Sequence, residues 1–309
     1  MQIPNNRTRS VLIALAGTTA WATTGIFFSV LLNRYQLAPL ALVFWRDLFI
    51  AVVALAGLRV MRPAALRISR KDLPFFFGYG FVGLATFNAM WIYSVKFNGA
   101  AVATVLAYSS PVFTVLLARL VLGEALTARK LVAAFVCLLG CAFVARAESL
   151  ATWQVNPLGI VVGLGTGVAY ACYSLSGRWS AGRYASSWTV TANGFLFAAG
   201  GLAIVHRPAT LFSLGTEWSG WALLVFLAVG PSLVGYALYT HSLRDLPAST
   251  AGLIAALEPA IAALMAVVFL GEQLVLTQGL GVALILGAVV LVQLEPDPAV
   301  PVAVQEPAA

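Results

Sequence analysis

Apolar stretches of about 20 residues recur along the whole chain and limit its fold more than any other feature. An α-helix rises about 1.5 Å per residue, so about 20 apolar residues cross the roughly 30 Å hydrocarbon core of a bilayer. Short connections with turn residues, such as FNG at 97–99 and RDLPAS at 244–249, separate the stretches. The sequence therefore predicts ten transmembrane helices, at residues 11–32, 38–58, 73–95, 100–121, 127–146, 157–178, 187–206, 218–240, 247–270 and 275–294.

The composition supports an all-α integral membrane protein. Of the 309 residues, 61% are hydrophobic and 9% are charged, and the mean hydropathy is +0.93, whereas a soluble domain is about 25% charged. The basic residues behind the net charge of +7 lie mostly in the short connections, so we expect no nucleic-acid partner. His206 and His241 both lie near segment ends, and we expect no metal site and no cofactor.

The distribution of Lys and Arg predicts the orientation. If the N-terminus is cytoplasmic, thirteen of these residues fall on the cytoplasmic side, and Arg34, Lys96, Arg146 and Arg207 fall on the other side. Such an excess is typical of cytoplasmic loops. We therefore predict that both termini are cytoplasmic, namely residues 1–10 and a proline-rich, disordered tail at 295–309.

The two halves of the chain repeat each other with an offset of 148 residues. AYSSPVFTVLLARLVLGE at 107–124 overlies AALEPAIAALMAVVFLGE at 255–272, and Pro111 falls on Pro259. Each half, 11–147 and 157–294, then holds five spans. Because five is odd, the halves must enter the membrane in opposite directions. Inverted repeats of this kind are typical of transporters that work by alternating access around a site near the midplane.

These features resemble a known family. Ten spans, two halves and a twice-occurring P-x11-G-E pattern are similar to the drug/metabolite transporter superfamily, and specifically to its EamA-type exporters. The resemblance covers about residues 10–294 and is most marked in the LEP…LGE run at 257–272. It implies a multi-pass transporter in a bacterial inner membrane. Members similar to this chain move amino acids, other metabolites or drugs, usually outward, and some carry aromatic amino acids.

Arg46 and Asp47 lie near the middle of the second predicted span. A charge at the bilayer centre costs about 2.5–3.5 kcal/mol on insertion scales. Consecutive helical residues point about 100° apart, so we expect that the two side chains do not simply pair with each other. At least one then needs a partner on another helix or a wet cavity. Two interpretations stay open: an interhelical ion pair that fixes packing, or an Arg46 that receives an anionic group such as a carboxylate.

Glu258 is the other midplane charge, and it precedes a proline. Pro259 cannot donate a hydrogen bond to the carbonyl of Ala255, so the sequence predicts a broken or kinked helix there, with Pro111 at the mirror position. Such breaks are tolerated in membranes where they line a cavity. Glu258 would hold a substrate ammonium, carry the coupling proton, or serve as a structural partner. Asp47, Glu258, Pro111 and Pro259 are the candidates for coupling or gating.

Glu124 and Glu272 follow glycines at the ends of two spans. Glycine is a common helix terminator, and a glutamate beside the start of the next helix suits its dipole. We expect both glutamates to act as caps.

Aromatic side chains with polar tips recur in mid-span at helical spacing. In hydrocarbon such tips need partners, so these residues tend to face the interior, where they line a cavity or pack the bundle. Together with Arg46 and Asn88 they form the predicted substrate-binding set; the aromatic members are Trp21, Trp91, Tyr108, Tyr170, Tyr173, Tyr236 and Tyr239.

The sequence thus predicts a secondary transporter without a phosphate-binding loop for ATP. An arginine, an acid and a ring of aromatics suit a small amphipathic solute, such as an apolar or aromatic amino acid, moved outward. The alternatives are export of drugs or lipophilic cations, import of metabolites and, more distantly, a receptor that transports nothing or an intramembrane enzyme. The expected partners are a small-molecule substrate and the lipid bilayer, for either a monomer or a homodimer.

Overall fold

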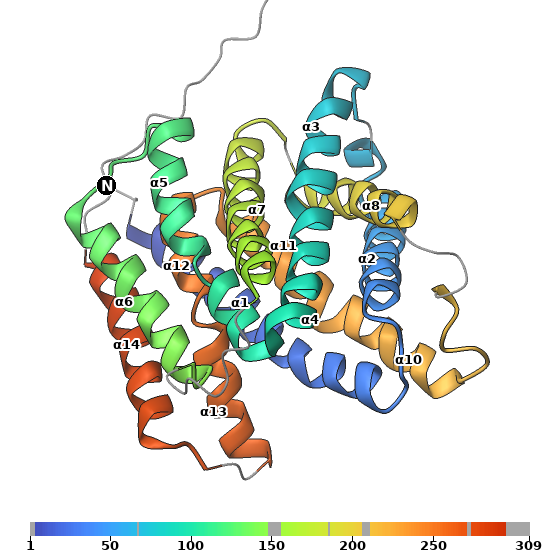
Figure 1. Cartoon of the computed structure of the whole chain (residues 1–309). Helices are drawn as coiled ribbons and strands as arrows, with labels where there is room; N and C mark the ends of the chain where they lie inside the picture. The colour runs from blue at the N-terminus through green and yellow to red at the C-terminus, as the bar shows by residue number, and fades with distance from the viewer. Residues whose placement is uncertain are drawn as a thin grey trace, which may run out of the picture.

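The computed structural model describes residues 4–66, 68–147, 156–184, 186–205, 211–270 and 273–294. Within these ranges every regular element is a helix (Figure 1). The predicted tail at 295–309, together with Glu272 and His206, lies outside the described residues.

The first half forms the helices that the apolar stretches predict. It comprises α1 (Pro4–Asn33), α2 (Pro39–Met61), the 3-10 turns η1 (Pro63–Leu66) and η2 (Arg70–Asp72), α3 (Leu73–Phe77), the π-helical segment η3 (Gly78–Ala85), α4 (Thr86–Ala107), α5 (Ser110–Leu122) and α6 (Ala128–Val144).

The second half repeats this order. It comprises α7 (Pro157–Ala181), α8 (Ser187–Val205), α10 (Trp218–Leu227), the π-helical segment η5 (Ala228–Ser232), α11 (Leu233–Ser242), α12 (Ala248–Ala255), α13 (Glu258–Leu270) and α14 (Leu276–Gln293). Several helix boundaries recur at an interval of 148 residues. These are the starts of α2 and α8, the ends of α1 and α7, and both ends of α5 and α13. The predicted repeat is therefore confirmed in the backbone itself.

Ordinary local signals set the helix ends. Pro39 opens α2, where a missing N–H costs nothing. The hydroxyl of Thr127 accepts from the Lys130 N–H at 3.2 Å and caps α6. Gly123 ends α5 with a φ of 69°, a left-handed conformation that favours glycine.

Two irregularities of the backbone recur in both halves. The third span contains η3, and its counterpart in the second half contains η5, where Pro231 lacks the N–H that a regular α-helix would use. The fourth span breaks at Tyr108–Ser109, and its counterpart breaks at Ala256–Leu257. A proline follows each break in the chain: Pro111 lies in the first turn of α5, and Pro259 lies in the first turn of α13. The predicted break before Pro259 is confirmed.

The third and fourth spans are joined by a bend with helical backbone. Along α7, Met90 lies nearest Gly165, and Ser94 donates to the carbonyl of Gly159. Later in α4, Leu106 lies against Gly163. The first part of α4 therefore runs toward the N-terminus of α7, and the last part runs back along α7 in the opposite direction. The chain reverses just after Asn98, where the sequence predicts a turn, although α4 is continuous through it.

The two halves interleave instead of forming separate lobes. α6 packs on its repeat mate α14, at the left of Figure 1, and α2 packs on its mate α8. α1 packs on α11. In the repeat, α7 corresponds to α1 and α4 corresponds to α11, and α7 and α4 likewise pack on each other. Exchanging the halves thus preserves the contacts, which is the pattern expected of two repeats related by two-fold pseudosymmetry.

Eight described segments are long and apolar enough to cross a membrane: 7–33, 39–61, 70–98, 102–122, 157–181, 218–242, 248–268 and 276–293. The other two predicted spans are α6, which has 17 residues, and α8, which carries Thr189, Thr191 and Asn193. The fold is an all-α membrane fold of ten helices in two inverted five-helix repeats. We call the face where α2, α5, α7 and α11 end the basic face, because Arg59, Arg62 and Arg119 lie there.

α6 and α14 cross with their backbones in direct contact. A Cβ added to Gly140 would lie 2.8 Å from the Gly281 carbonyl oxygen, and one added to Gly281 would lie 2.6 Å from the Gly140 oxygen. Small residues permit this close approach, which is a common way to associate helices in a membrane.

Gly140→Leu is therefore expected to destabilise the protein by about 1–3 kcal/mol, because the larger side chain must force the two helices apart. Thermal unfolding in detergent measures the change. Gly287→Leu is the matched control, because no heavy atom lies within 4 Å of a Cβ added there. Equal melting temperatures for both variants would contradict this account of the crossing.

Candidate functional site

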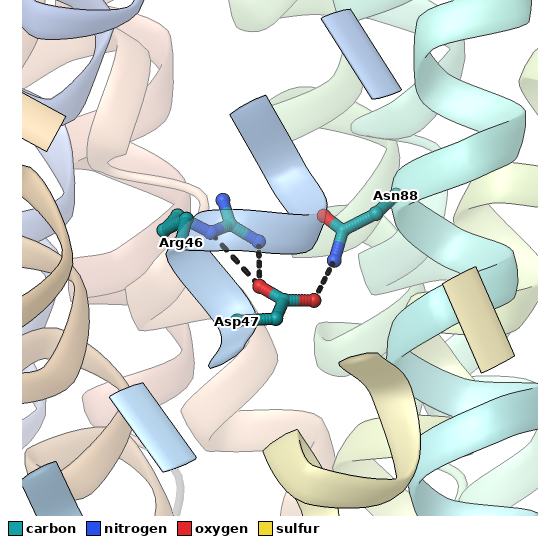
Figure 2. Close-up of polar contacts among 3 residues, drawn as sticks. All are labelled: Arg46, Asp47 and Asn88. Carbon is teal, nitrogen blue, oxygen red and sulfur yellow. Dashed lines mark hydrogen bonds and ion pairs between the residues drawn. The ribbon is translucent and has the colours of Figure 1, made fainter. Parts of the chain in front are cut away.

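Arg46 and Asp47 pair directly with each other, contrary to the expectation from their spacing. The Nε and Nη2 atoms of Arg46 donate to Oδ1 of Asp47 at 3.0 and 2.8 Å (Figure 2). The Cα–Cβ bonds of neighbouring helical residues do diverge, but the arginine side chain is long enough to turn its guanidinium back over the shorter aspartate. The prediction was wrong because it considered directions at Cβ and not the reach of the side chain.

The second oxygen of Asp47 is bound by another helix. The Asn88 side chain, from α4, donates its Nδ2–H to Oδ2 at 3.3 Å. Asp47 is 0% exposed and Arg46 is 6% exposed. The expectation that at least one of the charges finds a partner on a different helix is therefore confirmed, with Asn88 as that partner.

Aromatic rings flank the guanidinium. Its carbon lies 5.6 Å from the ring centre of Phe28 and 6.0 Å from that of Tyr236, within cation–π range. Neither bond to Asp47 uses Nη1. The expected polar cavity at Arg46 is not open in this conformation, since the side chain is enclosed between an acid and two rings.

Five of the predicted aromatic residues come together in one group. We call Trp21, Tyr170, Tyr173, Tyr236 and Tyr239 the aromatic cluster. Trp21 lies 4.8 Å from Tyr236 and 5.1 Å from Tyr239, between ring centres. Tyr173 lies 5.9 and 6.0 Å from the same two rings, and Tyr170 lies 5.8 Å from Tyr173. The cluster joins α1 of the first half to α7 and α11 of the second.

Neighbouring hydroxyl groups on α7 and α11 satisfy some of the polar tips of the cluster. The Tyr239 hydroxyl is 2.8 Å from that of Ser174, and the Tyr173 hydroxyl is 3.3 Å from that of Thr240. The indole N–H of Trp21, by contrast, is buried without a hydrogen-bond acceptor among the described residues. A buried donor without a partner costs about 1–3 kcal/mol, so this atom is available to an incoming acceptor.

Trp91 and Tyr108 lie outside the aromatic cluster. Trp91 packs edge-on against Phe28 at 6.3 Å, and so belongs to the surroundings of Arg46. Tyr108 stands at the break between α4 and α5, and its hydroxyl faces the carboxyl group of Glu258, the first residue of α13. The two helix breaks therefore meet across the interface of the halves.

The structure also brings in residues that the sequence analysis did not select. Tyr79 stacks on Tyr173 at 5.2 Å and Phe195 packs on Tyr236 at 4.7 Å. Tyr79 is a mid-span tyrosine, so the rule that selected the others would have found it. Phe28 and Phe195 have no polar tip and resemble any core phenylalanine in sequence.

A family model for the EamA-like transporter family matches the chain twice, at residues 8–146 and 157–294. The chain belongs to this family. The two matches coincide with the two repeats of the fold. The protein is therefore a membrane-embedded, multi-pass transporter and not an enzyme, and its environment is the lipid bilayer.

Relatives agree with this membership. An uncharacterized inner membrane transporter, YicL of Salmonella typhimurium, is 23% identical and covers 93% of this chain and 96% of its own. A probable terminal-alkyne amino-acid exporter of Streptantibioticus cattleyicolor is 28% identical over 85% of this chain and 86% of its own. The threonine/homoserine exporter RhtA of Salmonella typhimurium is 30% identical over 44% and 45%.

A solved structure supports the fold. A crystal structure with 21% sequence identity superposes with a TM-score of 0.78, covering 93% of this chain and 97% of the other. At this identity the match concerns the arrangement of helices alone.

Asp47→Ala is expected to destabilise the protein by about 3–5 kcal/mol, because it leaves the Arg46 guanidinium buried without its counter-charge. The double variant Arg46→Ala/Asp47→Ala is expected to melt at a higher temperature than Asp47→Ala, because both charges are gone. Asn88→Ala serves as the control that removes one hydrogen bond and leaves the ion pair. Thermal unfolding in detergent compares the three, and a double variant as unstable as Asp47→Ala would refute the pairing.

Proposed function

We propose that this transporter exports a small zwitterionic solute with an apolar side chain, most suitably an aromatic or other apolar amino acid, by alternating access. The observation that carries the proposal is an arginine held between aromatic rings beside the aromatic cluster, where the two inverted halves meet.

The chemistry of the pair suits recognition of a carboxylate. A guanidinium binds carboxylates through two parallel N–H groups. The substrate carboxylate competes with Asp47 and with the hydroxyl of Tyr236 for the guanidinium N–H groups, and the displaced Asp47 or Glu258 then attracts the ammonium group. The exchange keeps every buried charge paired throughout, which limits its cost.

The aromatic cluster suits the rest of such a solute. Rings 4.8–6.2 Å apart offer apolar surface and edges to an aromatic or aliphatic side chain. The Trp21 N–H, which has no acceptor among the described residues, adds a hydrogen-bond donor at the same place. The names of two relatives, both amino-acid exporters, also favour this solute class.

Export of lipophilic cations is the second candidate. A lone midplane arginine would repel a cation, but Asp47 neutralises Arg46 in the structure. An aromatic cluster beside a carboxylate is a common way to bind organic cations. Glu258, a half-buried residue at the start of α13, supplies a further carboxyl group from the second half.

In the orientation that we propose, the basic face is cytoplasmic, both termini lie on that side, and the membrane is a bacterial inner membrane. The positive-inside excess in the sequence supports this orientation, and the printed name of the Salmonella relative supports the membrane. The breaks at Tyr108–Ser109 and Ala256–Leu257 are the proposed hinges, with Pro111 and Pro259 behind them.

Counterflow in sealed liposomes tests the substrate class. Purified protein is expected to take up labelled aromatic or apolar amino acids against the same unlabelled solute, saturably. The variant Arg46→Ala/Asp47→Ala is expected to lower the apparent affinity by roughly tenfold to a hundredfold, because charge-assisted hydrogen bonds contribute about 1.5–3 kcal/mol. Arg34→Ala, an exposed arginine at the opposite face, is the matched control.

Two outcomes would contradict the proposal. Silence across the amino-acid panel, with saturable counterflow of a lipophilic cation, would select the second candidate. Wild-type affinity in the double variant would remove the pair from the site.

Glu258→Gln tests the coupling. If Glu258 binds and releases the coupling proton, this variant is expected to abolish uptake driven by a pH gradient and to preserve exchange of solute for solute, because glutamine keeps the shape and loses the titration. Glu217→Gln, an exposed acid, is the control. Survival of gradient-driven uptake in Glu258→Gln would make Glu258 a structural residue.

A further inference from the structure

Glu124 binds the opposite half of the protein. Its Oε1 accepts from the Ala248 N–H at 2.8 Å, and its Oε2 accepts from the Ser249 hydroxyl at 2.5 Å and the Ser249 N–H at 3.4 Å. Glu124 follows α5 in the first half, and Ala248 and Ser249 begin α12 in the second. Glu124 does bind the start of a helix, but the expectation that this is the next helix in sequence was wrong: Thr127 caps α6, and Glu124 caps α12.

The contact is shielded from solvent although it lies at the end of the bundle. Glu124 is 4% exposed, and Ala248 and Ser249 are 0% and 1% exposed. A buried carboxylate with three donors at a helix N-terminus is a strong arrangement, because the hydrogen bonds are charge-assisted and the helix dipole favours the anion.

A second contact between the halves lies nearby. The hydroxyl of Ser10, in α1, donates to Asp245 at 2.6 Å, in the connection between α11 and α12. Within the second half, Nη1 of Arg178 donates to the carbonyls of Leu243 and Arg244 at 2.7 and 2.6 Å. The connection that leads into α12 is thus tied to both halves on the basic face.

We propose that Glu124 is a latch that holds the basic face closed and must release α12 before solute enters from that face. The proposal rests on the alternating access proposed above, but not on the identity of the solute. The position allows reversal. Because the latch lies where the helices end, water can reach the carboxylate and the freed N–H groups once the halves part. A midplane ion pair has no such replacement for its partners.

The interface beneath the latch offers a site for a reporter. Thr114, on α5, is 0% exposed and faces Gly252 on α12, with its methyl carbon 3.6 Å from a Cβ added to Gly252. Cysteine differs little from threonine in size. In a background where Cys137, Cys141 and Cys172 are replaced by alanine, Thr114→Cys reacts with a water-soluble maleimide only when α5 and α12 separate.

The experiment measures the maleimide labelling rate of this reporter in nanodiscs, where both faces are accessible and orientation does not matter. Glu124→Gln is expected to raise the rate about tenfold, because loss of one or two charge-assisted hydrogen bonds shifts the closed population by about that factor. Ser249→Ala removes only the hydroxyl donor and is expected to raise the rate by a smaller factor. Glu217→Gln, on the opposite face, is the control and is expected to leave the rate unchanged.

The outcomes separate the latch from general loosening and from the substrate proposal. Unchanged labelling in both Glu124→Gln and Ser249→Ala would overturn the latch, as would an equal rise in Glu217→Gln. Ser249→Ala keeps the test valid if Glu124→Gln does not fold. Because no solute is present, failure here leaves the counterflow result untouched, and silence in counterflow leaves this result untouched.

Discussion

The hydrocarbon core of a bilayer offers no hydrogen-bond partner, and the structure follows from that constraint. Backbone groups are satisfied within helices, and the charges of Arg46 and Asp47 are satisfied by each other. Arg46 lies against Asp47, and Asn88 takes the remaining aspartate oxygen. Hydroxyls of the aromatic cluster find Ser174 and Thr240 on the same helices that supply the rings. Most of these interior polar groups are therefore already paired, and a polar solute must exchange partners with them to bind.

Regular features of the sequence predicted the architecture well. The length of the apolar stretches, the offset of 148 residues and the prolines after each break are properties of the backbone, and backbone geometry follows local rules. The family match then fell on the same two halves. The π-helical segments were not predicted, because no residue type specifies an extra residue in a turn, although Pro231 explains one of them afterwards.

Side-chain partners were predicted less well. The bond from Arg46 to Asp47 depends on how a long side chain folds back, and the partner of Glu124 depends on which helix end lies across the interface. Neither is a property of the local sequence. The rule that selected mid-span tyrosines would also have selected Tyr79. Phe28 and Phe195 matter only because Phe28 contacts the Arg46 guanidinium and Phe195 contacts the Tyr236 ring, which the local sequence does not show.

The backbone crossing of α6 and α14 is far from the middle of either helix. Gly140 is twelve residues after the start of α6 and four before its end, so the crossing divides the helix into arms of about 18 and 6 Å. With little side-chain volume between the helices, the crossing is a natural pivot. A rotation of about 10° there moves the basic-face end of α6 by about 3 Å and the other end by only about 1 Å. Because Gly281 lies near the start of α14, the arm toward the basic face is the longer one in both helices, so a rotation about this contact displaces their basic-face ends more than their other ends.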